Sequence, residues 1–171
     1  DREAVGIRKT LERVPEGKND WKPHEKSMPL GYLATIVATI PSWLDMVVNI
    51  SQVLSGNWDY VRQDIAAVIE VAHAARQKVK VIFENCYLKD DHKIQLCRIC
   101  SELNADWVKT STGYGTGGAT HDDLRLMRLH AAPHVQVTAA GGIRDLDSLL
   151  AVRALGVSRC GASRTKEMLD E

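Results

Sequence analysis

The sequence has no excess of charge of either sign and no long apolar run. Its 171 residues carry 22 Lys and Arg against 22 Asp and Glu, so the formal net charge is zero. A chain without net positive charge lacks the overall field that steers proteins to nucleic acids or anionic membranes. No apolar stretch approaches the roughly 18 residues of a membrane span, and the opening Asp1-Arg2-Glu3 does not resemble a signal peptide. We therefore expect a cytoplasmic protein with no nucleic-acid or membrane partner.

Cysteine and metal-binding patterns are also sparse. Four cysteines, all beyond the middle of the chain, make a poor disulfide framework for a domain of this size. Cys97 and Cys100 have C-x-x-C spacing, but they lie beside Ile94 and Leu96 in an amphipathic helical pattern, which favours packing over redox or metal chemistry. The six histidines form no H-E-x-x-H motif and no H-x-x-x-H motif on an uninterrupted helix. We predict neither a metal nor a cofactor.

Proline and glycine are unevenly distributed along the chain. Residues 1–43 hold four of the five prolines and only three of the twelve glycines. Within this segment, apolar residues recur at helical spacing in Ala4–Val14 and again in Leu30–Ile40, on either side of the polar stretch 15–27. The pattern predicts an N-terminal two-helix hairpin and a change of structure near Leu44.

From Leu44 onward, short β-branched runs alternate with longer amphipathic ones. The predicted strands are 44–50, 79–83, 106–111, 135–139 and 157–160, and the predicted helices are 58–76, 91–103, 121–130, 145–154 and a short one from about 163. Five strands that are each followed by a helix indicate an α/β fold with a parallel sheet, either open or part of a barrel. A closed eight-stranded barrel takes about 250 residues, so this chain is short for one.

One lysine stands out in the predicted strands. Lys109 lies in the otherwise apolar strand 106–111, close to the carboxyl end at which α/β folds gather functional groups. Two interpretations stay open for such a residue. The lysine either reaches water or an acidic partner at the strand end, or it acts as a nucleophile that forms a Schiff base.

Glycine-rich segments follow three successive predicted strands. They are 113–118, Gly141-Gly142, and Gly161 with the following Ala162-Ser163. None matches a nucleotide-binding signature. Strand ends that present bare backbone amides, two of them leading into helices, are nevertheless typical of a phosphate site.

Five sequence blocks resemble successive parts of deoxyribose-phosphate aldolase. They are Leu-Asp-Met-Val-Val-Asn around Asp45, Val-Ile-Phe-Glu-Asn-Cys-Tyr-Leu around Glu84, Trp-Val-Lys-Thr-Ser-Thr-Gly-Tyr-Gly-Thr-Gly-Gly-Ala-Thr around Lys109, Ala-Gly-Gly-Ile-Arg from Ala140 and Gly-Ala-Ser-Arg from Gly161. The resemblance extends from about Leu44 to Glu171. It implies a TIM-barrel class I aldolase that reversibly cleaves 2-deoxyribose 5-phosphate to glyceraldehyde 3-phosphate and acetaldehyde.

The resemblance also implies a role for individual residues. Lys109 would form the Schiff base, and Asp45 would assist the proton transfers. The substrate phosphate would be held by four residues, namely Gly113, Gly141, Gly142 and Ser163. The expected partner is accordingly a small phosphorylated sugar or an aldehyde.

Two departures from the family predict that this activity is weak or lost. The family has a second lysine in the strand before Gly-Gly-Ile-Arg, where this chain has Thr138. An amine attacks a carbonyl only when it is neutral, and a nearby ammonium group favours the neutral form. In addition, nothing before Leu44 resembles the first three strand–helix units of the family. The alternative is a folded but catalytically inactive chimera with no native substrate.

Residues 3–43 resemble the opening of a DinB-type four-helix bundle, through a helix, a Trp-Lys-Pro-His loop at residues 21–24 and a second helix. Ile36 stands where that family has a metal-binding histidine, so no metal site is implied. We thus predict a DinB-like hairpin, 1–43, joined by recombination or engineering to five parallel βα units of a partial TIM barrel, 44–171. Five strands cannot close a normal barrel, so the strand edges should be covered by the hairpin or paired in a homo-oligomer.

Overall fold

The computed structural model describes Asp20, residues 43–163 and residues 165–170. Nearly all of these belong to one compact unit, Asp45–Glu171. The predicted helical hairpin and its DinB-like features lie outside the described residues.

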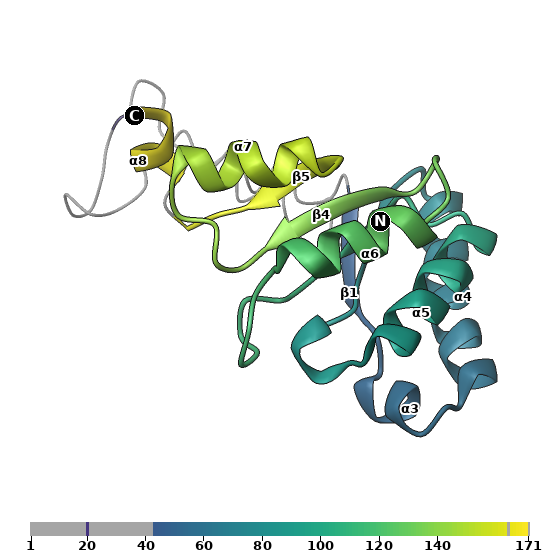
Figure 1. Ribbon diagram of the computed structural model, residues 1–171. Helices are drawn as coiled ribbons and strands as arrows, with labels where there is room; N and C mark the ends of the chain where they lie inside the picture. The colour runs from purple at the N-terminus through teal and green to yellow at the C-terminus, as the bar shows by residue number, and fades with distance from the viewer. Residues whose placement is uncertain (1–19, 21–42, 164, 171) are drawn as a thin grey trace. The chain divides into compact units, whose positions relative to one another are not determined.

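Strands and helices alternate along the described chain (Figure 1). The strands are β1 (Trp43–Val47), β2 (Lys78–Ile82), β3 (Trp107–Lys109), β4 (Gln136–Ala140) and β5 (Val157–Gly161). The helices are α3 (Ile50–Leu54), α4 (Trp58–Ala74), α5 (Asp90–Glu102), α6 (His121–His130), α7 (Leu146–Ala154) and α8 (Thr165–Asp170), with a short 3-10 helix, η2 (Asn85–Tyr87). The five predicted βα units are therefore confirmed.

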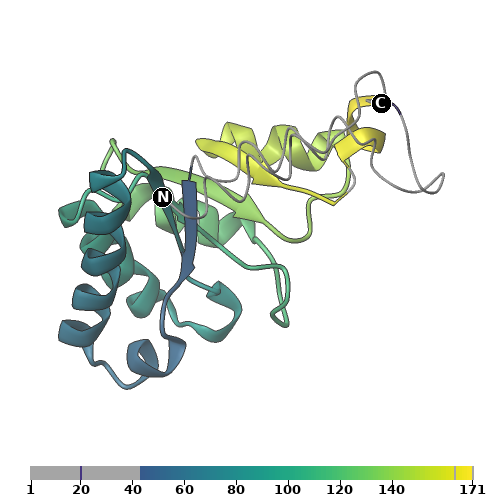
Figure 2. The same ribbon diagram turned by 180° about the vertical axis from the view of Figure 1, so that it is seen from behind.

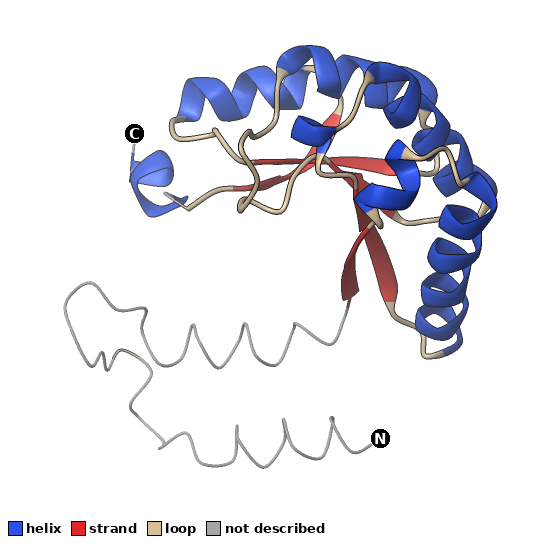
Figure 3. Cartoon of the chain, turned by 90° about the horizontal axis from the view of Figure 1, so that it is seen from below, coloured by secondary structure: helices blue, strands red, loops and turns tan. Residues whose placement is uncertain are grey.

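The strands form one parallel sheet in the order β1-β2-β3-β4-β5. The helices lie along one side of this sheet (Figure 3). Figure 2 shows the sheet from behind, with α4 packed near β2 and α7 near β5. A sequential order of parallel strands, with every crossover helix on the same side, is the arrangement found in barrels rather than in doubly wound sheets.

The two faces of the sheet differ in composition. Val79, Val81, Val108 and Val137 are completely buried and belong to the apolar core. Because side chains alternate along a strand, the residues between them point to the other face. The strand register places these residues in two rows, Lys80–Trp107–Gln136 and Ile82–Lys109–Thr138. The second face is therefore mostly polar.

Local sequence signals explain where several helices begin and end. Thr120 caps α6, since its Oγ1 accepts a hydrogen bond from the Asp123 backbone N–H at 3.1 Å. Gly156 follows α7 with φ +85°, a left-handed conformation that suits glycine at a helix end. The five-residue helix α3 was not predicted. It begins after Asn49, whose side chain accepts from the Gln52 N–H at 3.3 Å, and it is too short for a periodic pattern.

The four cysteines differ in burial: two are buried, Cys160 in β5 is partly buried and Cys86 is exposed. Cys97 and Cys100 are buried in α5, as their spacing within an amphipathic helix predicted. Burial raises the pKa of the Cys97 thiol to about 12 and also raises the pKa of Cys100. Cys86 lies on η2, the short 3-10 helix that follows β2, and its side chain is exposed. None of the described helices is long and apolar enough to cross a membrane.

Candidate active site

The most concentrated group of charges on the polar face is a carboxylate between two lysines. Lys109 Nζ donates a hydrogen bond to Asp45 Oδ2 at 3.0 Å, and Lys80 Nζ donates to Asp45 Oδ1 at 2.7 Å. The side chains of Lys80 and Lys109 are 9% and 16% exposed, whereas that of Asp45 is 31% exposed. Each carboxylate oxygen of Asp45 thus has its own ammonium partner.

Neighbouring strands bring these three residues together. Asp45 lies in β1, Lys80 in β2 and Lys109 at the end of β3, and the three strands are adjacent in the sheet. Burial raises the pKa of Asp45, but the hydrogen bonds and charges of Lys80 and Lys109 outweigh it and hold the pKa below its usual value. Asp45 is therefore ionised at neutral pH.

Sequence reasoning identified Lys109 and Asp45 but missed Lys80. The signal was present, because Lys80 interrupts the β-branched run of β2 between Val79 and Val81 in the same way as Lys109 interrupts its own strand. A lysine whose side chain is only 9% exposed needs a charged or hydrogen-bonding partner. The sequence alone gives no indication that its partner is the aspartate already assigned to Lys109.

Thr138 lies beside Lys109 in the sheet. The register pairs the two residues directly across β3 and β4. Thr138 is 4% exposed, and its Oγ1 has no hydrogen-bond partner among the described residues. A buried hydroxyl without a partner is unfavourable. The residue beside Lys109, the candidate nucleophile, therefore has a hydroxyl group that makes no hydrogen bond with the described residues.

Two of the three glycine segments are in contact. The loop after β3 and the turn after β4 meet where Gly118 lies against Gly141, so closely that a Cβ on Gly118 would lie 2.5 Å from the Gly141 carbonyl carbon. The Ala119 N–H donates to the carbonyl oxygens of Ala140 and Gly141, both at 3.0 Å. Backbone amides from two strand ends are thus brought to one place.

The remaining predicted phosphate residues differ in their surroundings. Gly113 and Gly142 have φ of +98° and +87°, and both have open space where a side chain would begin. Ser163 is exposed and lies two residues beyond the end of β5. The third segment begins beside the turn after β4, because the register of β4 and β5 pairs Gly161 with Ala140.

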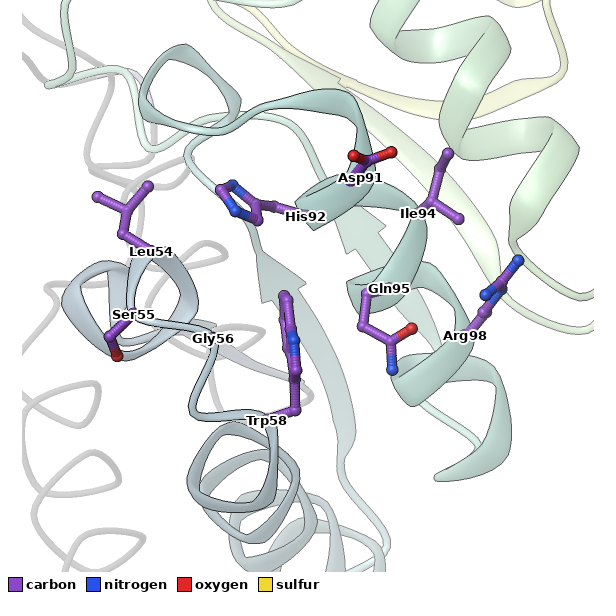
Figure 4. Close-up of a pocket in the computed structure, with 9 residues that line it drawn as sticks. All are labelled: Leu54, Ser55, Gly56, Trp58, Asp91, His92, Ile94, Gln95 and Arg98. Atoms are coloured by element: carbon purple, nitrogen blue, oxygen red, sulfur yellow. The ribbon is translucent and has the colours of Figure 1, made fainter.

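A separate cavity lies on the helical side of the unit, between the α3–α4 turn and α5 (Figure 4). Its volume is about 570 Å3, and the rings of Trp58 and His92 face it with their centroids 6.1 Å apart. None of the lysine, aspartate, threonine or glycine residues of the candidate active site lines this cavity. The lining residues are Leu54, Ser55, Gly56, Trp58, Asp91, His92, Ile94, Gln95 and Arg98. Among the described residues, no three His, Cys, Asp or Glu side chains are grouped to hold a metal ion.

The parallel strand–helix fold, with a lysine at one strand end and glycine loops at the neighbouring ends, matches the TIM-barrel-like architecture of aldolase structures. The family comparison agrees with this class. The family model for DeoC/LacD aldolases matches residues 41–162, and the chain belongs to this family. The DinB-like prediction for the preceding segment lies outside this match and stays a prediction.

Individual relatives support the same assignment. The chain is 74% identical over 128 residues to a deoxyribose-phosphate aldolase from Rhodopirellula baltica, covering 75% of this chain and 53% of the relative. Among solved structures, it resembles a putative deoxyribose-phosphate aldolase from Coccidioides immitis, with 33% identity, a TM-score of 0.71, and coverage of 80% of this chain and 54% of the other.

A tetrameric deoxyribose-phosphate aldolase from Aeropyrum pernix is also similar, with 27% identity and a TM-score of 0.67. This match covers 75% of the chain described here and 54% of the other chain. The chain spans about half the length of the curated relatives it matches.

Proposed function

We propose that this chain forms a Schiff base with an aldehyde or phosphorylated sugar and catalyses cleavage of 2-deoxyribose 5-phosphate at a low rate. The observation that carries the proposal is the hydrogen bond of 3.0 Å between Lys109 Nζ and Asp45 Oδ2 at the end of β3. It holds a largely buried amine, with a defined proton partner, where parallel folds of this type bind substrates.

The chemistry assigns a distinct task to each group. Neutral Lys109 attacks the substrate carbonyl, and the addition product takes up a proton and loses water to give an iminium ion. The iminium accepts the electron pair of the breaking carbon–carbon bond as the neighbouring hydroxyl group passes its proton to the Asp45 carboxylate through water. This step releases one aldehyde and leaves an enamine on Lys109. Protonation of the enamine carbon and addition of water then release acetaldehyde and restore the free amine. The Asp45 carboxylate balances the positive charge on the nitrogen and is placed to pass protons through a water molecule.

Lys80 and Thr138 define how this site differs from that of the resembling family. Thr138 provides no charge next to Lys109, so we assign the second ammonium group of the site to Lys80, on the far oxygen of Asp45. Because Lys80 acts on Lys109 only through Asp45, its assistance should be smaller than that of a directly adjacent lysine. The expected activity is therefore weak.

A chain with no turnover is the second candidate function. The observation that favours it is the buried Thr138 hydroxyl, which has no partner among the described residues at the position where the family has a lysine. Under this alternative, Lys109 and Asp45 remain a structural ion pair on the polar face. The two candidates differ in whether Lys109 reacts with an aldehyde.

Borohydride trapping tests the proposed chemistry. Incubation with acetaldehyde and borohydride should give a stable adduct that peptide mass spectrometry locates on Lys109, and Lys109→Arg should remove it. Lys89 is the internal control, because it is exposed and a lysine outside the candidate active site should react with acetaldehyde only slowly. Thr138→Lys should increase the trapping rate by about tenfold or more, since one pKa unit of ammonium repulsion changes the neutral amine fraction by that factor. Adduct formation at Lys89 equal to that at Lys109 would support the second candidate.

For the phosphate end of the substrate, we propose the backbone amides at Gly113, Gly141 and Gly142, together with Ser163. The contact between Gly118 and Gly141 supports this assignment, because it joins the loops after β3 and β4.

We also propose that the chain self-associates through a strand edge. In the described residues, β5 is paired on one side only, with β4, and an unpaired edge is prone to bind another strand. The tetrameric state named for the aldolase from Aeropyrum pernix is compatible with assembly in this family. Light scattering should show a mass that increases with protein concentration, whereas a constant monomer mass would contradict the proposal.

A further inference from the structure

Glu84 has an unusual backbone conformation directly after β2. Its φ is +57°, in the left-handed region that non-glycine residues rarely adopt. The residue is only 4% exposed, and its side chain belongs to no ion pair among the described residues. A strained and buried acidic residue persists only where the surrounding structure holds it in place.

The partner of the Glu84 carboxylate is Thr112, three residues beyond Lys109. The Thr112 backbone N–H lies 3.2 Å from both carboxylate oxygens, and the Thr112 hydroxyl donates to Oε2. The same hydroxyl accepts a hydrogen bond from the Tyr114 N–H at 3.0 Å. Glu84 thus accepts each of the hydrogen bonds that Thr112 donates.

Backbone hydrogen bonds hold the same two segments together on either side of Glu84. The Phe83 N–H donates to the Lys109 carbonyl oxygen at 3.0 Å, and the Asn85 N–H donates to the Thr110 carbonyl oxygen at 2.9 Å. The backbone that carries Lys109 is therefore fixed to residues 83–85. A change in the Glu84 conformation should therefore move the backbone of the residues that follow Lys109 in the sequence, from Thr110 to Thr112.

The glycine loop then folds back over the carboxylate. A Cβ on Gly115 would lie 2.9 Å from Glu84 Oε1 and 2.8 Å from Cys86 Sγ, so a larger residue there would displace these side chains. On its far side, the loop is fixed by the contact of Gly118 with Gly141. The loop 112–118 is thus attached at two points, to Glu84 after β2 and to Gly141 after β4.

We propose that Glu84 is a positioning residue that fixes the loop 112–118 in the conformation that exposes the Gly113 amide to an anionic substrate group. It acts through Thr112 and does not touch the reacting atoms. Gly113 has open space beside it and makes none of the hydrogen bonds that fix Thr112, Tyr114 and Ala119. The inference rests on the proposed function, because that function supplies the phosphorylated substrate.

The test compares Glu84→Gln with Glu84→Asp, and uses Glu70→Gln on the exposed side of α4 as the matched control. The concentration of 2-deoxyribose 5-phosphate that half-saturates borohydride trapping should rise about tenfold or more in Glu84→Gln. The corresponding concentration of acetaldehyde, which has no phosphate, should change less than twofold. Glu84→Asp retains the carboxylate and should recover part of the loss. Equal effects on both compounds, or none on either, would overturn the inference.

A second measurement does not depend on reaction at Lys109. Inorganic phosphate added to the unmodified chain should shift the amide NMR signal of Gly113, and Glu84→Gln should weaken this response about tenfold while Glu70→Gln leaves it unchanged. If the Gly113 signal of the unmodified chain does not respond, the inference is wrong whatever Lys109 does. If it responds but acetaldehyde is not trapped, the proposed function fails and the role of Glu84 in phosphate binding stands.

Discussion

The two faces of the sheet are stabilised by different kinds of contact. On the helical side, branched apolar side chains such as Val79, Val81 and Val108 are completely buried and need no specific partner. On the opposite side, Lys80 and Lys109 each donate a hydrogen bond to Asp45. Apolar packing is stabilised by the area removed from water, whereas each polar contact depends on its particular partner. Substitutions should therefore act by different mechanisms on the two faces.

The largest expected effect is on the apolar side. Phe83 is completely buried in the core, and Phe83→Ala would leave a cavity in addition to removing apolar contacts. The free energy of unfolding should fall by about 3–5 kcal/mol. Urea denaturation monitored by circular dichroism measures this change. A loss below about 1 kcal/mol would show that the core around β2 is loosely packed.

A smaller effect is expected for Asp45→Asn on the polar side. The amide keeps the shape but leaves two ammonium groups without their carboxylate, so the free energy of unfolding at pH 7 should fall by about 1.5–3 kcal/mol. The pKa of Asp45 is lowered in the folded chain, so its contribution is present above about pH 4 and disappears as the pH falls through the folded-state pKa.

The difference between the Asp45→Asn variant and the unmodified chain should accordingly narrow as the pH falls below about 4. Urea denaturation at a series of pH values checks this. A constant difference down to the lowest accessible pH would mean that the Asp45 charge does not stabilise the fold.

The smallest effect has the opposite sign. Thr138→Val removes a buried hydroxyl that has no partner among the described residues, so the free energy of unfolding should rise by about 0.5–1 kcal/mol. The matched control is Thr110→Val, because the buried Thr110 hydroxyl donates to the Ala140 carbonyl oxygen at 3.2 Å and accepts from the Ala140 N–H at 3.0 Å. The control should lose about 1–3 kcal/mol. Equal losses in both variants would show that Thr138 has a partner.

The regular part of the fold could be predicted because it depends on local patterns. The alternation of strands and helices from β1 to α8 follows from apolar periodicity, and the end of α6 and the start of α7 lie within two residues of their predicted positions. The missed elements, α3 and η2, are only five and three residues long. Segments of that length have too few residues to establish a period.

The site was predictable only in part. Lys109 and Asp45 belong to recognisable sequence blocks, and the structure places them in contact. Lys80 and the left-handed Glu84 were not assigned roles, because their importance comes from contacts across neighbouring strands. Single-sequence patterns carry information about each strand but not about the distance between side chains on different strands.

The thiols described above give this protein a natural labelling site. Burial raises the pKa values of Cys97, Cys100 and the partly buried Cys160 and so keeps these thiols protonated at neutral pH. Only the thiolate reacts readily with alkylating reagents. Cys86 is exposed, and its Sγ lies where a side chain on Gly115 would be. A fluorescent or spin probe on Cys86 would thus report the motion of the glycine loop directly, without the introduction of a new cysteine.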